Sequence, residues 1–120
     1  MRIVVLMLLA VWLGVPTGCG ARVRPAFESP DPSSRLAAMV QAADRGDQRA
    51  VPRLIEALDS DDPAVRLVAI AALDRLTGQT HGYAAYAPER ERQAAVDRWV
   101  AWHAGSDATS AGRPEAEDPR

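Results

Sequence analysis

The sequence contains no lysine, a single cysteine and only two histidines among its 120 residues. All fourteen basic residues are arginine, and sixteen acidic residues outnumber them. The resulting net charge of −2 argues against a nucleic-acid surface, which requires concentrated positive charge. Because Cys19 is the only cysteine, no disulfide can form within the chain.

Motifs for common catalytic and metal chemistry are also missing. There is no Gly-rich phosphate loop, no GxSxG and no HExxH sequence. His81 and His103 lack the further ligands that a metal site requires. Asp59, Asp61 and Asp62 lack the glycine and terminal glutamate of a calcium loop, so helix capping explains them better. We therefore expect no enzyme, no metal site and no cofactor.

The longest apolar run, residues 3–13, has eleven residues and is too short for a standard membrane-spanning helix. Arg2 precedes this run, and small residues follow it. A charged start, an apolar core and a small-residue exit are typical of a secretory signal. The sequence therefore predicts export across the inner membrane.

The four residues that end at Cys19, Pro-Thr-Gly-Cys, resemble the bacterial lipoprotein signal, although Pro16 stands where a Leu-like residue is usual. The resemblance implies a leader at residues 1–18 and a diacylated Cys19. It places the protein at the cell envelope, on the periplasmic face or the outer membrane, and two acyl chains give stable attachment. The alternatives are a plain signal cut after Ala21 and an uncleaved anchor.

Residues 19–33 are predicted to form a flexible tether. Pro25, Pro30 and Pro32 stiffen this segment, and Phe27 is its only large apolar residue. A tether of this kind would hold a folded domain away from the membrane surface.

Three helices are predicted between residues 34 and 78. Apolar residues recur at i, i+3, i+4 and i+7 in the first helix, residues 35–45, which Ser33 or Ser34 can cap, and in the second, residues 48–58. In the third helix the apolar stripe is so wide that the helix should be central and packed on more than one side. Asp62 caps its start, and Gly78 ends it.

The stretch from Ala50 to Gly78 resembles one HEAT repeat, an antiparallel helix pair that stacks into solenoids. The matching residues in its two helices are Val51, Pro52, Leu54, Ile55 and Leu58, then Asp62, Pro63, Val65, Arg66, Ala69, Ala72 and Leu73. The resemblance implies that Asp61 or Asp62 and Arg66 bond to neighbouring repeats, in a stacking role.

A last helix is predicted from Pro88 to about Ala104, with Val96, Trp99, Val100 and His103 in its stripe. Its sequence and the preceding loop resemble the tail of small bacterial envelope HEAT-like proteins, from which the loop departs at His81, Ala84 and Ala85. Trp99 and Trp102 form either a binding surface or a lid over the solenoid end, and we favour a lid packed with Tyr83 or Tyr86. Residues 105–120 are polar and predicted to be a disordered tail.

Together these patterns predict an all-α domain at residues 34–104, a short α-solenoid of about four helices. The leading hypothesis is a non-catalytic interaction or scaffold module that binds an unknown protein partner through a surface including Arg66, Asp74 and Arg75. The second hypothesis, from HEAT-like bilin lyases, is an enzyme or accessory subunit, which would need a polar cavity with a titratable cluster. A third is a purely structural envelope protein. The sequence leaves open whether the loop at residues 81–86 binds a ligand.

Overall fold

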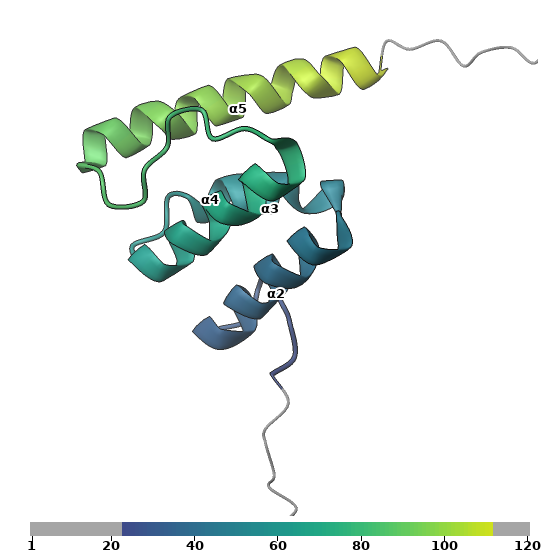
Figure 1. Cartoon of the computed structure of the whole chain (residues 1–120), viewed down its shortest axis with the longest axis vertical. Coiled ribbons are helices and arrows are strands. Elements are labelled where there is room, and N and C mark those ends of the chain that lie inside the picture. Colours follow the sequence, from purple (N-terminus) through teal and green to yellow (C-terminus); the bar gives the residue numbers. More distant parts are fainter. Residues whose placement is uncertain (1–22, 112–120) are drawn as a thin grey trace, which may run out of the picture.

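The computed structural model describes residues 23–111, and this part of the chain is all-helical, without strands (Figure 1). The elements are α2 (Pro32–Arg45), the 3-10 helix η2 (Gln48–Ala50), α3 (Val51–Ala57), α4 (Pro63–Thr77) and α5 (Glu89–Ala111). The predicted all-α solenoid of about four helices is confirmed. The expected leader at residues 1–18 lies outside the described residues, and none of the described helices is long and apolar enough to cross a membrane.

Capping residues explain where the helices begin and end. The Asp62 carboxylate accepts a hydrogen bond of 2.8 Å from the Ala64 amide at the start of α4. Gly78 ends α4 in a left-handed conformation with φ of 70°, which a side chain would disfavour. At α2 the cap is Asp31 rather than the predicted Ser33 or Ser34, and its carboxylate accepts from both of their amides.

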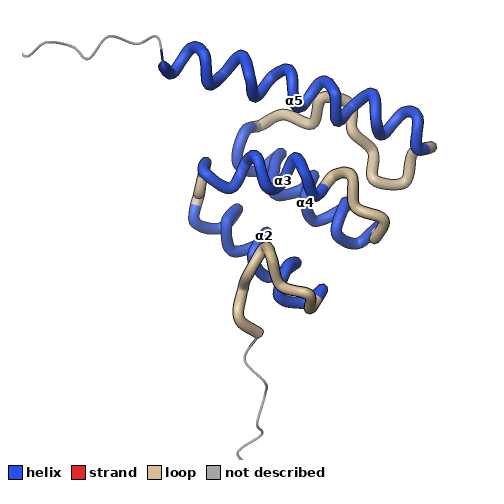
Figure 2. Tube along the Cα trace, turned by 180° about the vertical axis from the view of Figure 1, so that it is seen from behind, coloured by secondary structure: helices blue, strands red, loops and turns tan. Residues whose placement is uncertain are grey.

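Helix α4 is the centre of the stack. It lies side by side with α2 and α3, and α5 runs along α3 (Figures 1 and 2). The apolar core joins residues from α2, α3, α4, the loop after α4 and α5. The interior is small, so a few large side chains fill most of it; the largest fully buried ones are Trp99, Leu54, Leu58 and Leu73.

The segment before α2 is not the free tether that the sequence predicted throughout residues 19–33. Phe27 packs against the core, and the Ala26 amide donates to the Ser34 carbonyl at 3.1 Å. The Arg35 guanidinium donates to the Ser29 carbonyl at 2.8 Å, and Glu28 forms an ion pair with Arg53. We call residues 25–29 the strap. Burial of the one large apolar side chain explains its attachment.

Helix α5 also differs from the prediction, since it continues seven residues past Ala104 into the expected disordered tail. The polar side chains of this last part of α5 form hydrogen bonds within the helix. The hydroxyls of Ser106 and Thr109 donate to carbonyls four residues earlier, at 3.0 Å each. His103 Nε2 lies 3.4 Å from the Asp107 carboxylate, one turn away. The polar side chains thus find partners within the helix. The polar composition of this segment had instead indicated disorder.

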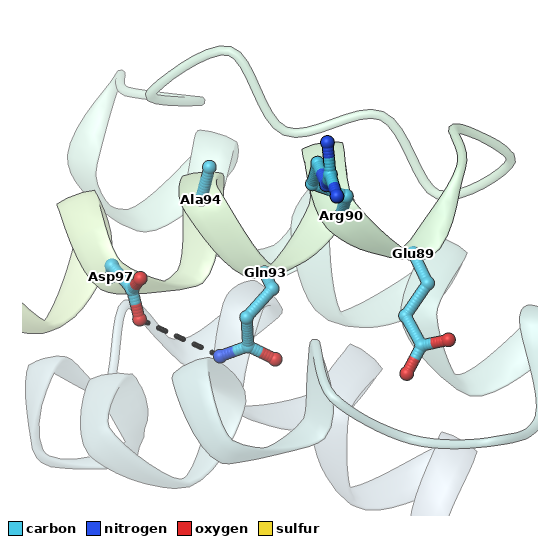
Figure 3. Close-up of a pocket in the computed structure, with 5 residues that line it drawn as sticks. All are labelled: Glu89, Arg90, Gln93, Ala94 and Asp97. Atoms are coloured by element: carbon cyan, nitrogen blue, oxygen red, sulfur yellow. Dashed lines mark hydrogen bonds between the residues drawn. The ribbon is translucent and has the colours of Figure 1, made fainter.

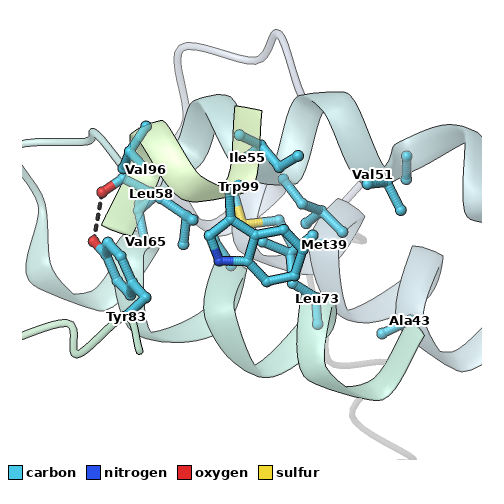
Figure 4. Close-up of a cluster of buried hydrophobic side chains, with 14 of the residues drawn as sticks. Met39, Ala43, Val51, Ile55, Leu58, Val65, Leu73, Tyr83, Val96 and Trp99 are labelled. Atoms are coloured by element: carbon cyan, nitrogen blue, oxygen red, sulfur yellow. Dashed lines mark hydrogen bonds between the residues drawn. The ribbon is translucent and has the colours of Figure 1, made fainter. Parts of the chain in front are cut away.

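We expect Trp99→Ala to lower the free energy of unfolding by about 3–5 kcal/mol, because the Trp99 side chain is fully buried at the centre of the core (Figure 4). Val100→Ala is the matched control, since Val100 lies next to Trp99 on α5 and is 55% exposed. Denaturant unfolding measures both. Equal stability of the two variants would contradict the role of Trp99 as a core residue.

Candidate functional site

An apolar groove runs between α2 and α4 on the outside of the stack. Its volume is about 270 Å³, and its lining residues are Val40, Ala43, Asp44, Leu67, Val68, Ala71, Ala72 and Arg75. Val40 and Leu67, on neighbouring helices, are 49% and 46% exposed. Because one groove gathers them, they form a continuous apolar surface, which we call the α2–α4 groove.

One end of this groove is charged. Arg75, in the last turn of α4, donates to Asp44, near the end of α2, at 2.9 Å. Both side chains remain more than half exposed, at 63% and 54%. Because the two C-terminal ends meet here, α2 and α4 run in the same direction along the groove. Asp74, also predicted for the interaction surface, is exposed on α4. Asp62, for which the resemblance implied a bond to a neighbouring repeat, caps the start of α4.

Arg66 does not line the groove, contrary to its expected place on the interaction surface. It is buried, with 8% of its surface exposed. Its guanidinium donates to the carbonyls of Ser60 at 2.7 Å, Asp61 at 2.9 Å and Ala85 at 3.1 Å. The guanidinium carries its N–H donors on separate nitrogens, so it can reach carbonyls on both sides of the side chain, whereas a lysine would have to do so from one nitrogen. Arg66 therefore joins the turn before α4 to the loop after it.

The loop after α4 is held under α5 by aromatic contacts. The His81 ring lies edge-on to Trp99 with ring centroids 4.4 Å apart, and Trp102 lies 5.5 Å from both rings. The Trp99 indole N–H donates to the Thr80 carbonyl at 3.2 Å, and Arg98 donates to the His81 carbonyl at 2.9 Å. We call His81, Trp99 and Trp102 the aromatic cluster. It covers the end of the stack, the place where a lid was expected.

His81 is the member that sequence analysis missed. Its backbone φ is 47°, a left-handed conformation that costs energy for a residue with a side chain. Its buried Nε2 atom has no hydrogen-bond partner among the described residues. The contacts of the His81 ring with Trp99 and Trp102 explain why this nitrogen is buried. Only its position next to Gly82 could have indicated a left-handed backbone at this residue.

Tyr83 secures the other side of the loop. The side chain is 7% exposed, and its hydroxyl donates to the Leu58 carbonyl at 2.5 Å (Figure 4). Burial raises the pKa of the Tyr83 hydroxyl, and the positive charges of Arg66 and Arg92 oppose this shift. Tyr86, the alternative lid residue, is 75% exposed.

The two hollows larger than the groove each lie along α5 alone and do not gather catalytic groups. One, of about 550 Å³, is lined by Glu89, Arg90, Gln93, Ala94 and Asp97, all from the first turns of α5 (Figure 3). A hollow on a single helix is a surface feature, and its one internal bond joins Gln93 to Asp97 at 3.5 Å. Within residues 23–111 no three His, Cys, Asp or Glu side chains are grouped to hold a metal ion.

We expect Arg66→Met to lower the free energy of unfolding by about 2–4 kcal/mol, because three carbonyls lose a charged hydrogen-bond donor. The control is Arg75→Met, which removes an exposed ion pair and should cost less than about 1 kcal/mol. Denaturant unfolding gives the two values, and protease cleavage in residues 78–88 should rise only for Arg66→Met. A smaller loss at position 66 than at position 75 would refute this role of Arg66.

Tyr83 should make the stability fall at alkaline pH. Above about pH 10 the unfolded chain ionises Tyr83 before the folded chain does, so the folded state holds more protons and loses stability as pH rises. Tyr83→Phe should cost about 0.5–1.5 kcal/mol at pH 7 and reduce the alkaline loss. Tyr86→Phe is the control and should retain the full alkaline loss. Thermal unfolding between pH 7 and 11.5 measures these differences, and an unchanged pH profile in Tyr83→Phe would contradict the assignment.

Comparison with known proteins gives one result. The family model for HEAT repeats matches residues 21–98, which include the strap, α2, α3, α4 and the first half of α5. No curated protein and no solved structure matches the chain. The match covers more than half of the sequence and agrees with the stack of α2, α3 and α4 around one core. The chain belongs to the family of HEAT-repeat proteins.

Proposed function

We propose that this protein is a non-catalytic protein-binding module, exported and held at the bacterial cell envelope by a lipid on Cys19. HEAT repeats generally mediate protein–protein interaction. The observation that carries the proposal is the α2–α4 groove, in which Val40 and Leu67 each expose nearly half of their surface. Covering apolar surface of this kind with a partner is favourable, because it removes the surface from water.

Because the strap is attached to the domain, the distance between the proposed lipid on Cys19 and the folded domain is short. Phe27 is fixed to the domain, and only seven residues separate it from Cys19. Eight extended peptide units span at most roughly 28 Å. A lipid on Cys19 would therefore keep the domain close to the membrane, whereas the tether expected from the sequence would have allowed a greater distance. A partner of this module is then a protein of the same membrane or one that lies against it.

The groove would remain accessible in this arrangement. Phe27 lies beside Ala38 and Ala42 on α2, while Val40 and Asp44 belong to the opposite side of the same helix. The anchor is thus attached to the side of α2 that faces away from the groove. Attachment to a membrane and binding of a protein can occur together.

The test is cross-linking in intact cells, followed by capture of the tagged full-length chain and separation of membrane and soluble fractions. The native chain should appear in the membrane fraction with a reproducible protein adduct. Leu67→Glu should lose at least nine-tenths of the adduct and stay in the membrane fraction, because only the groove is changed. Cys19→Ser should move the chain to the soluble fraction.

Val100→Glu is the matched control for Leu67→Glu, since it introduces the same charge at a similarly exposed position on α5. It should keep both the adduct and the membrane attachment. Loss of the adduct in both Glu variants, or in neither, would count against the groove as the binding surface. A native chain found only in the soluble fraction would refute the lipid anchor.

A further inference from the structure

We infer that the α2–α4 groove is occupied by the same groove of a second copy of this chain, so that the module acts as a symmetric dimer. This inference rests on the proposed function, because it names the partner of the proposed binding surface. It comes from the way charged and apolar groups are distributed over the face formed by α2 and α4.

The charged residues of this face are complementary to the same residues on a second copy of the face. Asp44 and Arg75 lie at the same end of the groove, one on each helix, and they are 2.9 Å apart. A two-fold axis that runs along the groove between the helices places α2 of one copy opposite α4 of the other, at the same height. Each Asp44 then faces the Arg75 of the partner copy. The four side chains form a closed set of alternating charges, and each is exposed enough to accept a second partner.

The apolar residues follow the same symmetry. Val40 lies one turn before Asp44, and Ala71 and Leu67 lie one and two turns before Arg75. The rotation that pairs the charges therefore sets Val40 of one copy against Ala71 and Leu67 of the other. Val40 can then fit into the space above Ala71, beside the larger Leu67, as ridges of one helix fit into grooves of another. A partner with a strong net charge would find no complement, since the end of the groove carries one acid and one base.

Extension of the stack at its ends is less favourable than this lateral contact. The strap packs along α2, with Phe27 beside Ala38 and Ala42, and its Glu28 pairs with Arg53 of α3. At the other end, the loop after α4 is held by the bond from Arg66 to the Ala85 carbonyl, and the aromatic cluster covers it. Among the hollows that lie between helices in the described part of the chain, the α2–α4 groove is the most apolar, so a second copy finds its apolar contact there.

The size of the face predicts a weak dimer in dilute solution. Helices of 14 and 15 residues are each about 21 Å long, and two packed side by side give a face of roughly 400 Å². Stable interfaces bury about 800 Å² on each partner. Confinement on a membrane raises the local concentration of the copies and compensates for this small area. The dimer should therefore form on the membrane and dissociate when the chain is diluted in detergent.

The experiment is a charge exchange between two tagged copies of the full-length chain, cross-linked in intact cells. Native chains with different tags should capture one another. Asp44→Arg chains should lose self-capture at least tenfold, because two arginines would face each other, and so should Arg75→Asp chains. Cells that express one copy of each variant should regain capture between the two tags to within about twofold of native. Each single variant has lost its internal ion pair, so only pairing between copies explains recovery on mixing.

Leu67→Glu should abolish self-capture, and Val100→Glu should leave it at the native level. Thermal unfolding of each charge variant shows whether it is folded. Failure of the mixed cells to recover capture, or self-capture by the single charge variants at the native level, would overturn the dimer. Groove-dependent adducts with a different protein and none with the second tag would also overturn it, but would leave the proposed function standing. Adducts that do not depend on Leu67 would refute both.

Discussion

The bonds of Arg66 are the constraint on which the rest of this small stack depends. The side chain is buried and donates to three backbone carbonyls, two in the turn before α4 and one in the loop after it. Burial of a charged group is costly unless hydrogen bonds satisfy it, and the carbonyls need a donor equally. One guanidinium meets both requirements. It thereby fixes the loop in the position from which Tyr83 and the aromatic cluster can close the end of the core.

A stack of so few helices is stable only if its ends are covered. Here the chain supplies both covers without adding a complete repeat. The strap covers α2 with one phenylalanine, and α5 covers the other end with Trp99, which is fully buried. With the ends closed, the exposed apolar surface that remains between two helices is on the side of the stack. The geometry therefore favours an interaction across the α2–α4 groove over extension into a longer solenoid.

Helix positions could be predicted from the sequence because each signal is local. The Asp62 cap, the Gly78 end and the apolar stripe between them specify α4 without reference to any other part of the chain. The strap could not be predicted in this way, since docking of Phe27 depends on a surface that exists only after α2 has folded. The burial of Arg66 and the packing of His81 also arise from contacts with residues 15–20 positions away. The end of α5 was missed because its polar residues, Ser and Thr among them, are also common in disordered tails, although here their hydroxyls bond to the helix backbone.

The proposed anchor and the proposed dimer support each other physically. A groove with a small apolar area and one pair of charges at its end binds weakly when both copies diffuse freely in three dimensions. A strap that holds the domain within roughly 28 Å of its anchor limits the copies to a thin layer. Within such a layer a weak contact becomes populated, and loss of the lipid would disperse the dimer without altering the fold. The same groove on a freely diffusing chain would remain largely unoccupied, so attachment at Cys19 would itself control association.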